Sequence, residues 1–352
     1  MRRSLLAHAA WIACLWGGEA DAQSWKRVSG VDSTRGVYAL ARQDGAFYAV
    51  SDTLVYQSAN GTVWSPTTSQ PPARFGGYSL LGNSTGLYVG TVQDGVSRTT
   101  DGGKSWHRPA SGLDANSVVG LAALGDTVYA ATGEAGVYGF NSRSGGASFS
   151  YNSGLFQSGS TAIAATSGGL LAGVGNYLFA RPRGAAEWTS VNTEPSQVQV
   201  FDLLSTGKVV YAGTDKGVFR TSGDSANLLA WRSADIGAMK GRYITALAVQ
   251  GSRVYAGLNY SGQHWIWSTD DGGTTWDIRA HEFTDLWNLM VAGNRMWAAR
   301  EDGLWYYDLD PVSVRPAERV ARPDKKPGFR IFDGTSTRRL DGRRAREASL
   351  AR

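Results

Sequence analysis

Cysteine and histidine are nearly absent from this chain of 352 residues, which has one cysteine, Cys14, and four histidines. A single cysteine can form neither an intrachain disulfide nor a site that needs several thiolates. The histidines stand in unrelated contexts, without the HExxH or comparable spacing of a metal centre. Glycine is abundant, with 45 residues, but no glycine-rich stretch lies between a strand and a helix. We therefore expect no metal and no cofactor.

Long apolar runs are also scarce. Residues 5–16 form one apolar run after two arginines, and no later segment approaches the ~18 consecutive apolar residues of a membrane helix. Small residues at Ala20 and Ala22 follow the run in the positions that signal peptidase requires. Residues 1–22 therefore predict a signal peptide cleaved near Ala22 and export to the periplasm or the medium, with no transmembrane segment in the mature chain.

Two other readings of the leader stay open. Lipid attachment at Cys14 is less favoured, because Trp11 stands where a lipoprotein motif has a small aliphatic residue. The paired arginines Arg2 and Arg3 also allow a twin-arginine export route.

Positive charge is concentrated at the C-terminal end. Residues 315–352 carry 12 Lys and Arg against 5 Asp and Glu, whereas residues 23–314 are nearly neutral. A neutral body argues against nucleic-acid binding by that part of the chain. We expect residues 315–352 to form a basic tail, with at most one small hairpin over residues 328–340.

A repeated hairpin organises residues 23–314. The segment VVYAGTDKGVFRTS, residues 209–222, reads as apolar strand, polar turn and apolar strand. Seven copies follow one another at steps of 40 to 44 residues. Their equivalent positions are Tyr48, Tyr88, Tyr129, Leu171, Tyr211, Tyr255 and Trp297. A period near ~40 residues with several strands in each repeat predicts an all-β fold, a single seven-bladed β-propeller.

The repeats also predict how the ring closes. Most repeats end in a short strand that contains tryptophan, but the seventh lacks one before Pro311. A strand of this kind stands alone near the start of the mature chain, around Trp25. We expect it to complete the seventh blade, which removes an exposed sheet edge.

Two repeats carry a sharper turn motif. Residues 99–106 read TTDGGKSW and residues 269–276 read TDDGGTTW, and both match the Asp-box pattern S/T-x-D-x-G-x-T/S-W. The aspartates can bond turn amides, the glycines can adopt positive φ and the tryptophans can pack inward, so we interpret these residues as structural. They are Asp101, Gly103, Trp106, Asp271, Gly273 and Trp276.

Through these motifs, the chain over about residues 24–310 resembles the BNR/Asp-box propellers, a superfamily that contains sialidases, xyloglucanases and sortilin-type receptors. Seven repeats, an export signal and an initial tryptophan strand are most similar to its photosystem II stability/assembly-factor-like branch. That resemblance implies a non-catalytic module that holds another protein. The other repeats depart from the motif; for example, Ser58-Ala59-Asn60-Gly61 is shortened.

The enzymatic alternative is a sialidase-like or other glycoside-cleaving or sugar-binding propeller. The closest string to the FRIP signature of sialidases is Phe329-Arg330-Ile331-Phe332, which follows the ring and lacks the proline. We therefore predict no catalytic residues. A pair of carboxylates drawn from different blades stays open as a hydrolytic site, and Tyr260 and Trp265 would then be sugar platforms.

For the favoured function, we expect a monomer that binds another polypeptide, with a glycan as the alternative ligand. The blade links and the turns between second and third strands share one face of a propeller, and several of them carry arginine or aromatic residues, a combination typical of interfaces. The longest of these turns, residues 259–265, is expected to be an elongated recognition loop. The predicted contact residues are Arg35, Arg74, Arg242, Tyr260, His264 and Trp265.

Overall fold

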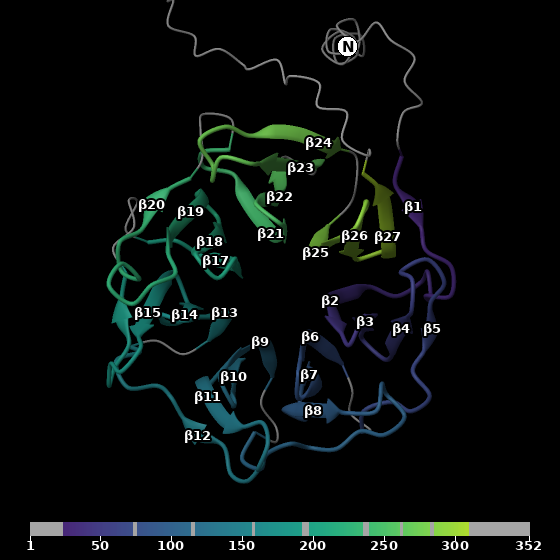
Figure 1. Cartoon of the computed structure of the whole chain (residues 1–352), viewed down its shortest axis with the longest axis horizontal. Helices are drawn as coiled ribbons and strands as arrows, with labels where there is room; N and C mark the ends of the chain where they lie inside the picture. Colours follow the sequence, from purple (N-terminus) through teal and green to yellow (C-terminus); the bar gives the residue numbers. More distant parts are fainter. Residues whose placement is uncertain are drawn as a thin grey trace, which may run out of the picture. The chain divides into compact units, whose positions relative to one another are not determined.

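The computed structural model describes residues 24–72, 76–113, 117–156, 159–191, 197–234, 239–260, 263–281 and 285–309. All of them belong to one compact unit, Met1–Pro311. The predicted signal peptide and basic tail lie outside the described residues. The described part is all β, in seven antiparallel sheets arranged as a ring (Figure 1), which confirms the predicted seven-bladed propeller.

Blades 1 to 3 follow the chain from the ring axis outward. Blade 1 has β2 (Val37–Gln43), β3 (Ala46–Ser51), β4 (Val55–Ser58) and β5 (Ser65–Pro66). Blade 2 has β6 (Gly77–Asn83), β7 (Gly86–Thr91) and β8 (Val96–Thr99), and its fourth position is taken by a single bridge between Arg98 and His107. Blade 3 has β9 (Val118–Leu124), β10 (Thr127–Thr132), β11 (Gly136–Asn141) and β12 (Phe149–Ser150).

Blades 4 to 7 repeat this order. Blade 4 has β13 (Ser160–Thr166), β14 (Gly169–Val174), β15 (Tyr177–Pro182) and β16 (Thr189–Ser190). Blade 5 has β17 (Val200–Ser205), β18 (Val209–Thr214), β19 (Gly217–Ser222) and β20 (Arg232–Ser233). Blade 6 has β21 (Tyr243–Gln250), β22 (Arg253–Tyr260), β23 (Gln263–Thr269) and β24 (Asp277–His281). Blade 7 has β25 (Leu286–Ala292), β26 (Arg295–Arg300), β27 (Gly303–Asp308) and β1 (Lys26–Arg27).

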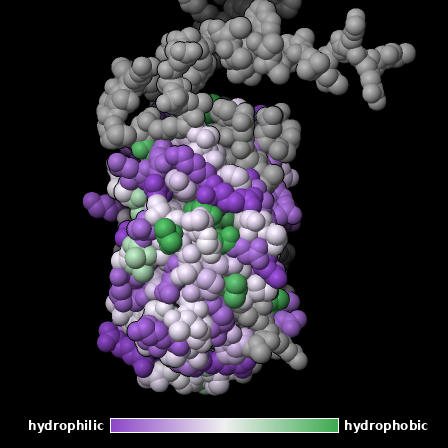
Figure 2. All heavy atoms as spheres, turned by 90° about the vertical axis from the view of Figure 1, so that its right-hand side faces the viewer, coloured by the Kyte–Doolittle hydropathy of each residue, from purple (hydrophilic) through white to green (hydrophobic). Residues whose placement is uncertain are grey.

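The core lies between neighbouring sheets. Every residue of β7 and of β14 is buried, because the middle strands are covered on both faces by the adjacent blades. The outer wall is different: Figure 2 shows a mostly hydrophilic surface with isolated hydrophobic residues on the side where Figure 1 places β1 and β5. Scattered apolar side chains of this kind are normal for a protein surface.

Strand direction divides the ring into two faces. Because the strands of each blade are antiparallel, the links between blades and the turns between second and third strands lie on one face, which we call the link face. The turns between first and second strands and between third and fourth strands lie on the other, the turn face. The Asp-box turns belong to the turn face.

Strand β1 joins the two ends of the described chain within blade 7. Its two residues pair antiparallel with β27, Lys26 opposite Tyr306 and Arg27 opposite Trp305. The Trp305 ring lies between two guanidinium groups, with Arg27 at 4.8 Å and Arg300 at 4.6 Å from its centroid. Cation–π contacts of this kind add to the two ladder positions that such a short strand can supply.

The next pair repeats the arrangement on the other side of the sheet. The Tyr306 ring lies between Lys26, at 5.8 Å, and Arg295, at 4.3 Å. The Asp308 carboxylate accepts hydrogen bonds from both cations, at 3.1 Å from Lys26 Nζ and 2.8 Å from Arg295 Nε. The seam is therefore held mainly by side chains.

Candidate functional site

The Asp-box carboxylates are fully engaged within their own turns. Asp101 accepts hydrogen bonds from the backbone N–H of Lys104 and of Ser105, both at 3.0 Å, and from the hydroxyls of Ser105 at 2.6 Å and Thr99 at 2.7 Å. The Ser105 hydroxyl is the main cause that holds the pKa of Asp101 well below its ordinary value. A carboxylate with this many local donors has little capacity left for a ligand.

The second box repeats this geometry. Asp271 accepts from the backbone N–H of Thr274 and of Thr275, both at 2.9 Å, and from the Thr275 hydroxyl at 2.7 Å. Burial alone would raise the pKa of Asp271, but these hydrogen bonds outweigh it and lower the pKa. The indole of Trp276 donates to the carbonyl of Ala234 in the preceding blade, at 2.8 Å, so the box also fastens two blades together.

The glycines of the two boxes are needed for the close approach of the preceding blade. Gly273 has φ +92°, and a Cβ there would lie 2.4 Å from the carbonyl oxygen of Ala234. Gly103 has φ +85°, and a Cβ would lie 2.6 Å from Thr67. Trp106 donates to the carbonyl of Ser69 at 3.0 Å. This geometry supports the structural interpretation of all six box residues.

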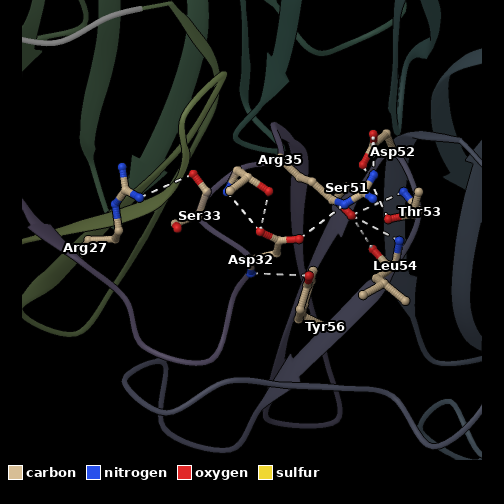
Figure 3. Close-up of polar contacts among 10 residues, drawn as sticks. Arg27, Asp32, Ser33, Arg35, Ser51, Asp52, Thr53, Leu54 and Tyr56 are labelled. Atoms are coloured by element: carbon tan, nitrogen blue, oxygen red, sulfur yellow. Dashed lines mark hydrogen bonds and ion pairs between the residues drawn. The ribbon is translucent and has the colours of Figure 1, made fainter.

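On the link face, Arg35 ties a blade link to a neighbouring turn (Figure 3). Its guanidinium bonds Asp32, in the same link, at 3.2 Å and Asp52, in the turn between β3 and β4, at 3.1 Å. Asp32 also accepts from the backbone N–H and hydroxyl of Thr34, and the backbone hydrogen bond of Thr34 is the main cause that lowers its pKa. Arg35 is therefore partly neutralised, although its side chain is 41% exposed.

Blade 6 rises above the other blades on the link face. Its second strand, β22, has eight residues, and its pairing with β23 continues to Tyr260 opposite Gln263. The expectation of an elongated loop over residues 259–265 was therefore wrong, because backbone pairing extends the hairpin through most of that segment. The result is a two-stranded projection, which we call the raised hairpin and define as residues 259–260 and 263–265.

The predicted contact residues of the raised hairpin lie in different environments. His264 is buried, with 2% of its side chain exposed, and its Nε2 lies 3.3 Å from a carboxylate oxygen of Asp285 in the next link. Burial lowers the pKa of His264, which outweighs the opposing effect of Asp285. Trp265 is partly exposed and packs against the cluster that contains Met239. The side chain of Tyr260 lies outside the described residues.

Arg242 lies beside this hairpin in the link between blades 5 and 6. Its backbone N–H donates to the carbonyl of Met239 at 3.1 Å, and its side chain is partly exposed. Next to it, Tyr243 is exposed and contacts the Phe201 ring, with centroids 5.9 Å apart. Arg242 and the exposed Tyr243 thus lie where the link between blades 5 and 6 meets the raised hairpin, which carries Trp265. Arg74 lies outside the described residues.

A set of residues near the ring axis was missed by sequence analysis. Each first strand carries a register shift near the link face, and the residue at the shift is displaced from the ladder. That residue is aromatic in four blades: it is Phe201 in blade 5, and Trp287, Tyr38 and Tyr78 in the adjacent blades 7, 1 and 2. The rings of Tyr38 and Trp287 stack at 4.5 Å and 3°, and Tyr78 meets Tyr38 edge-on at 5.4 Å.

One sequence signal could have found these aromatic residues. In blades 7, 1 and 2 a large aromatic residue follows the first residue of an otherwise small and apolar strand. Tyr78 is 40% exposed, so part of this cluster is open to solvent on the link face.

Asp202 is a carboxyl group of the described residues whose pKa is raised. It lies on β17, and its side chain accepts the backbone N–H of Leu247 in the next blade at 2.7 Å. Desolvation raises its pKa to about 6, despite the opposing hydrogen bonds from Leu247 and Leu203. Through this hydrogen bond, Asp202 positions the first strand of the next blade.

The described residues contain neither a group of metal-binding side chains nor a membrane-spanning helix. Within the ranges given above, no three or more His, Cys, Asp or Glu side chains are grouped so that they could hold a metal ion. The described part of the chain also contains no helix with the length and hydropathy of a membrane span.

Comparison with known proteins agrees with the fold. Residues 12–143 match the family model described as the DUF6242 beta propeller domain. No curated protein matches the chain significantly.

Several solved structures are similar. YCF48 from Cyanidioschyzon merolae has a TM-score of 0.64 at 18% identity, over 81% of this chain and 98% of that chain. The structure of YCF48 bound to D1 peptide has a TM-score of 0.62 at 14% identity, over 83% of this chain and 98% of that one. The extracellular domain of BT4673, a putative one component system from B. thetaiotaomicron, has a TM-score of 0.65 at 17% identity, over 81% of this chain and 40% of that one. The chain is thus a seven-bladed β-propeller that resembles the photosystem II assembly-factor-like propellers in fold.

Proposed function

We propose that this chain is an exported, non-catalytic propeller that binds another polypeptide on its link face. The observation that carries the proposal is the junction of the raised hairpin with the link that holds Arg242. Trp265 packs on the side of that hairpin that faces Met239, and Arg242 follows Met239 in the same link. Here an aromatic residue lies on a paired strand and an arginine lies in the adjoining link, and these two residue types are enriched among the anchors of polypeptide interfaces.

Rigidity favours recognition here. The strands beneath the junction are paired along their whole length, so little conformational entropy is lost when a partner binds. Arg35, Arg74 and Tyr260 supply further contacts on the same face, and buried His264 supports the hairpin from behind through Asp285. A propeller of similar fold, YCF48, is known bound to a peptide, which supports a peptide segment as the ligand of this ring.

The test begins with capture. The mature chain is used to isolate binding proteins from the exported fraction of its host, and the captured protein is titrated against the wild type and against Arg74→Ala with Arg242→Ala. Interface arginines truncated to alanine commonly cost ~1–3 kcal/mol each, so the double variant is expected to bind at least about tenfold more weakly. Its thermal midpoint should match that of the wild type.

The control is Arg253→Ala, which removes an arginine of blade 6 from the opposite face, where it pairs with Asp270. This variant should bind like the wild type. Unchanged binding by the double variant would overturn the proposed contacts. Release of sugar from a glycoside by the wild type would instead support the sugar-cleaving alternative.

A further inference from the structure

A cleft on the turn face lies between blades 3 and 4, far in sequence from the junction described above. Its volume is about 370 Å³, within the range of small-molecule sites. The first turn of blade 3 and the last turn of blade 4 form its rim, and Tyr129 and Tyr151 form its inner wall. The complete lining is Leu124, Gly125, Tyr129, Tyr151, Gly169, Leu170, Arg181, Pro182, Arg183, Gly184 and Ala185.

The cleft has a positively charged wall that the described residues do not neutralise. Arg181 lies flat on the Tyr151 ring, 3.7 Å from its centroid, and its Nε donates to the carbonyl of Ala185 at 3.0 Å. These two contacts fix the plane of the guanidinium but leave its terminal nitrogens available as donors. Neither Arg181 nor Arg183 forms an ion pair with any described carboxylate, and no acidic residue lines the cleft.

Hydroxyl groups add to this set of donors. Tyr129 is buried, and its ring meets the Tyr151 ring edge-on at 5.2 Å. Burial, together with the neighbouring Tyr151, raises the pKa of Tyr129 to about 12. The phenol therefore stays protonated at physiological pH and can donate a hydrogen bond. Because Tyr129 and Tyr151 also hydrogen-bond each other, one phenol O–H and the fixed guanidinium are left to meet an oxyanion, which accepts several charge-assisted hydrogen bonds.

The remaining walls are apolar. Leu124 and Leu170 line the cleft beside the tyrosine rings, so a ligand body that is flat and apolar would be better accommodated than a fully hydrated one.

We propose that this cleft binds a small ligand with an apolar, ring-shaped body and one oxyanion, a carboxylate or a phosphate, held by Arg181 and Arg183. Carboxylate and phosphate oxygens share the chemistry that a guanidinium recognises. The site is separate from the polypeptide-binding face, so its failure would leave the proposed function untouched.

The test uses three probes with the same phenyl ring: phenylacetate, phenyl phosphate and the neutral phenylacetamide. Each is titrated against the mature chain by calorimetry and ligand-observed NMR at low ionic strength. At least one anion is expected to bind with a Kd of about 1 mM or tighter, and the amide at least about tenfold more weakly. The tighter of the two anions identifies the natural oxyanion, and added salt should weaken its binding.

Three variants place the site. Arg181→Ala should reduce binding of the preferred anion by at least about tenfold, and Arg183→Gln by a smaller factor. Arg143→Ala removes an exposed arginine of blade 3 on the same face, where it pairs with Asp126, and should change nothing. Because Arg181 also packs on Tyr151, the thermal midpoint of each variant is measured. If Arg181→Ala unfolds, the affinity of Arg183→Gln for the preferred anion tests the site instead.

Three outcomes would overturn the proposal. The first is that the neutral amide binds as tightly as the two anions. A second is that neither phenylacetate nor phenyl phosphate binds at a concentration of about 10 mM. The third is that the preferred anion binds to both Arg181→Ala and Arg183→Gln as tightly as to the wild type.

Discussion

The Asp-box aspartates of the turn face and two aspartates of the link face are held in different ways. On the turn face, Asp101 and Asp271 are satisfied by donors within the same few residues. On the link face, Asp52 and Asp302 pair with arginines from other segments, Arg35 and Arg27. A carboxylate that is satisfied inside its own turn stabilises that turn in any context. One that is paired across segments can exchange its partner, so a ligand on the link face can compete with the existing contacts of Asp52 and Asp302.

The largest expected effect lies on the turn face, at the tryptophans that fasten one blade to the next. Trp276 is buried, whereas Trp106 is only partly buried. Trp276→Ala is therefore expected to lower the free energy of unfolding by about 3–5 kcal/mol through the cavity that it leaves, and Trp106→Ala by clearly less. Denaturant titration measures both. Equal losses would show that the two boxes fasten their blades to the same extent.

The second effect is a pH dependence near the link face. The folded-state pKa of Asp202 is raised from 3.8 to about 6, so the folded state holds this proton more tightly than the unfolded state. Its stabilising contribution is present below pH ~4 and is lost as the pH rises through ~6. Asp202→Asn should therefore increase the free energy of unfolding by about 2 kcal/mol at pH 8 and by little at pH 4. An equal gain at both pH values would contradict this cause.

A smaller effect with the opposite sign is expected at the second Asp-box. The pKa of Asp271 is lowered in the folded state, so its contribution is present above the unfolded pKa and is lost as the pH falls through the folded value. Asp271→Ala should cost about 1 kcal/mol at pH 7, because the turn amides lose their acceptor but can reach water. Unfolding of the wild type and of the variant at pH 7 and pH 2 would show whether the difference closes on acidification.

The smallest effect is expected from the basic tail. Residues 315–352 lack the repeat and carry uncompensated charge, so their deletion should leave the thermal midpoint of the ring almost unchanged. A fall of about 10 °C in differential scanning calorimetry would mean that the tail stabilises the ring.

The sequence predicted the repeated part of this fold well and its departures from the repeat poorly. Alternating apolar residues around a Gly-containing turn, as in β18 and β19, identify both strands and their register, and the count of seven blades follows. The raised hairpin was misjudged because polar and aromatic residues such as Asn259 and Tyr260 resemble a loop until their backbone pairing is known.

The sites were harder to predict than the strands. The displaced residues Tyr38, Tyr78 and Trp287 depend on a shift of one residue in the ladder, which leaves no mark in composition. His264 is buried and contacts Asp285 of the following link, a neighbour that the sequence pattern of its own strand does not reveal. The cleft between blades 3 and 4 joins Tyr129 and Arg181, which only the packing of two blades brings together.

The seam of blade 7 has a mechanical consequence. Because β1 and β27 pair antiparallel, the first residue of β1 lies beside the last residues of β27, and there Lys26 contacts Asp308. Tension applied between these two points would load the seam one pair at a time: first Lys26 and Tyr306, then Arg27 and Trp305, and finally the hydrogen bond from Val28 to Leu304. Unzipping in this order resists force far less than shearing all the pairs at once, so a pull on its two ends would open the ring at blade 7 while the other six blades stay folded.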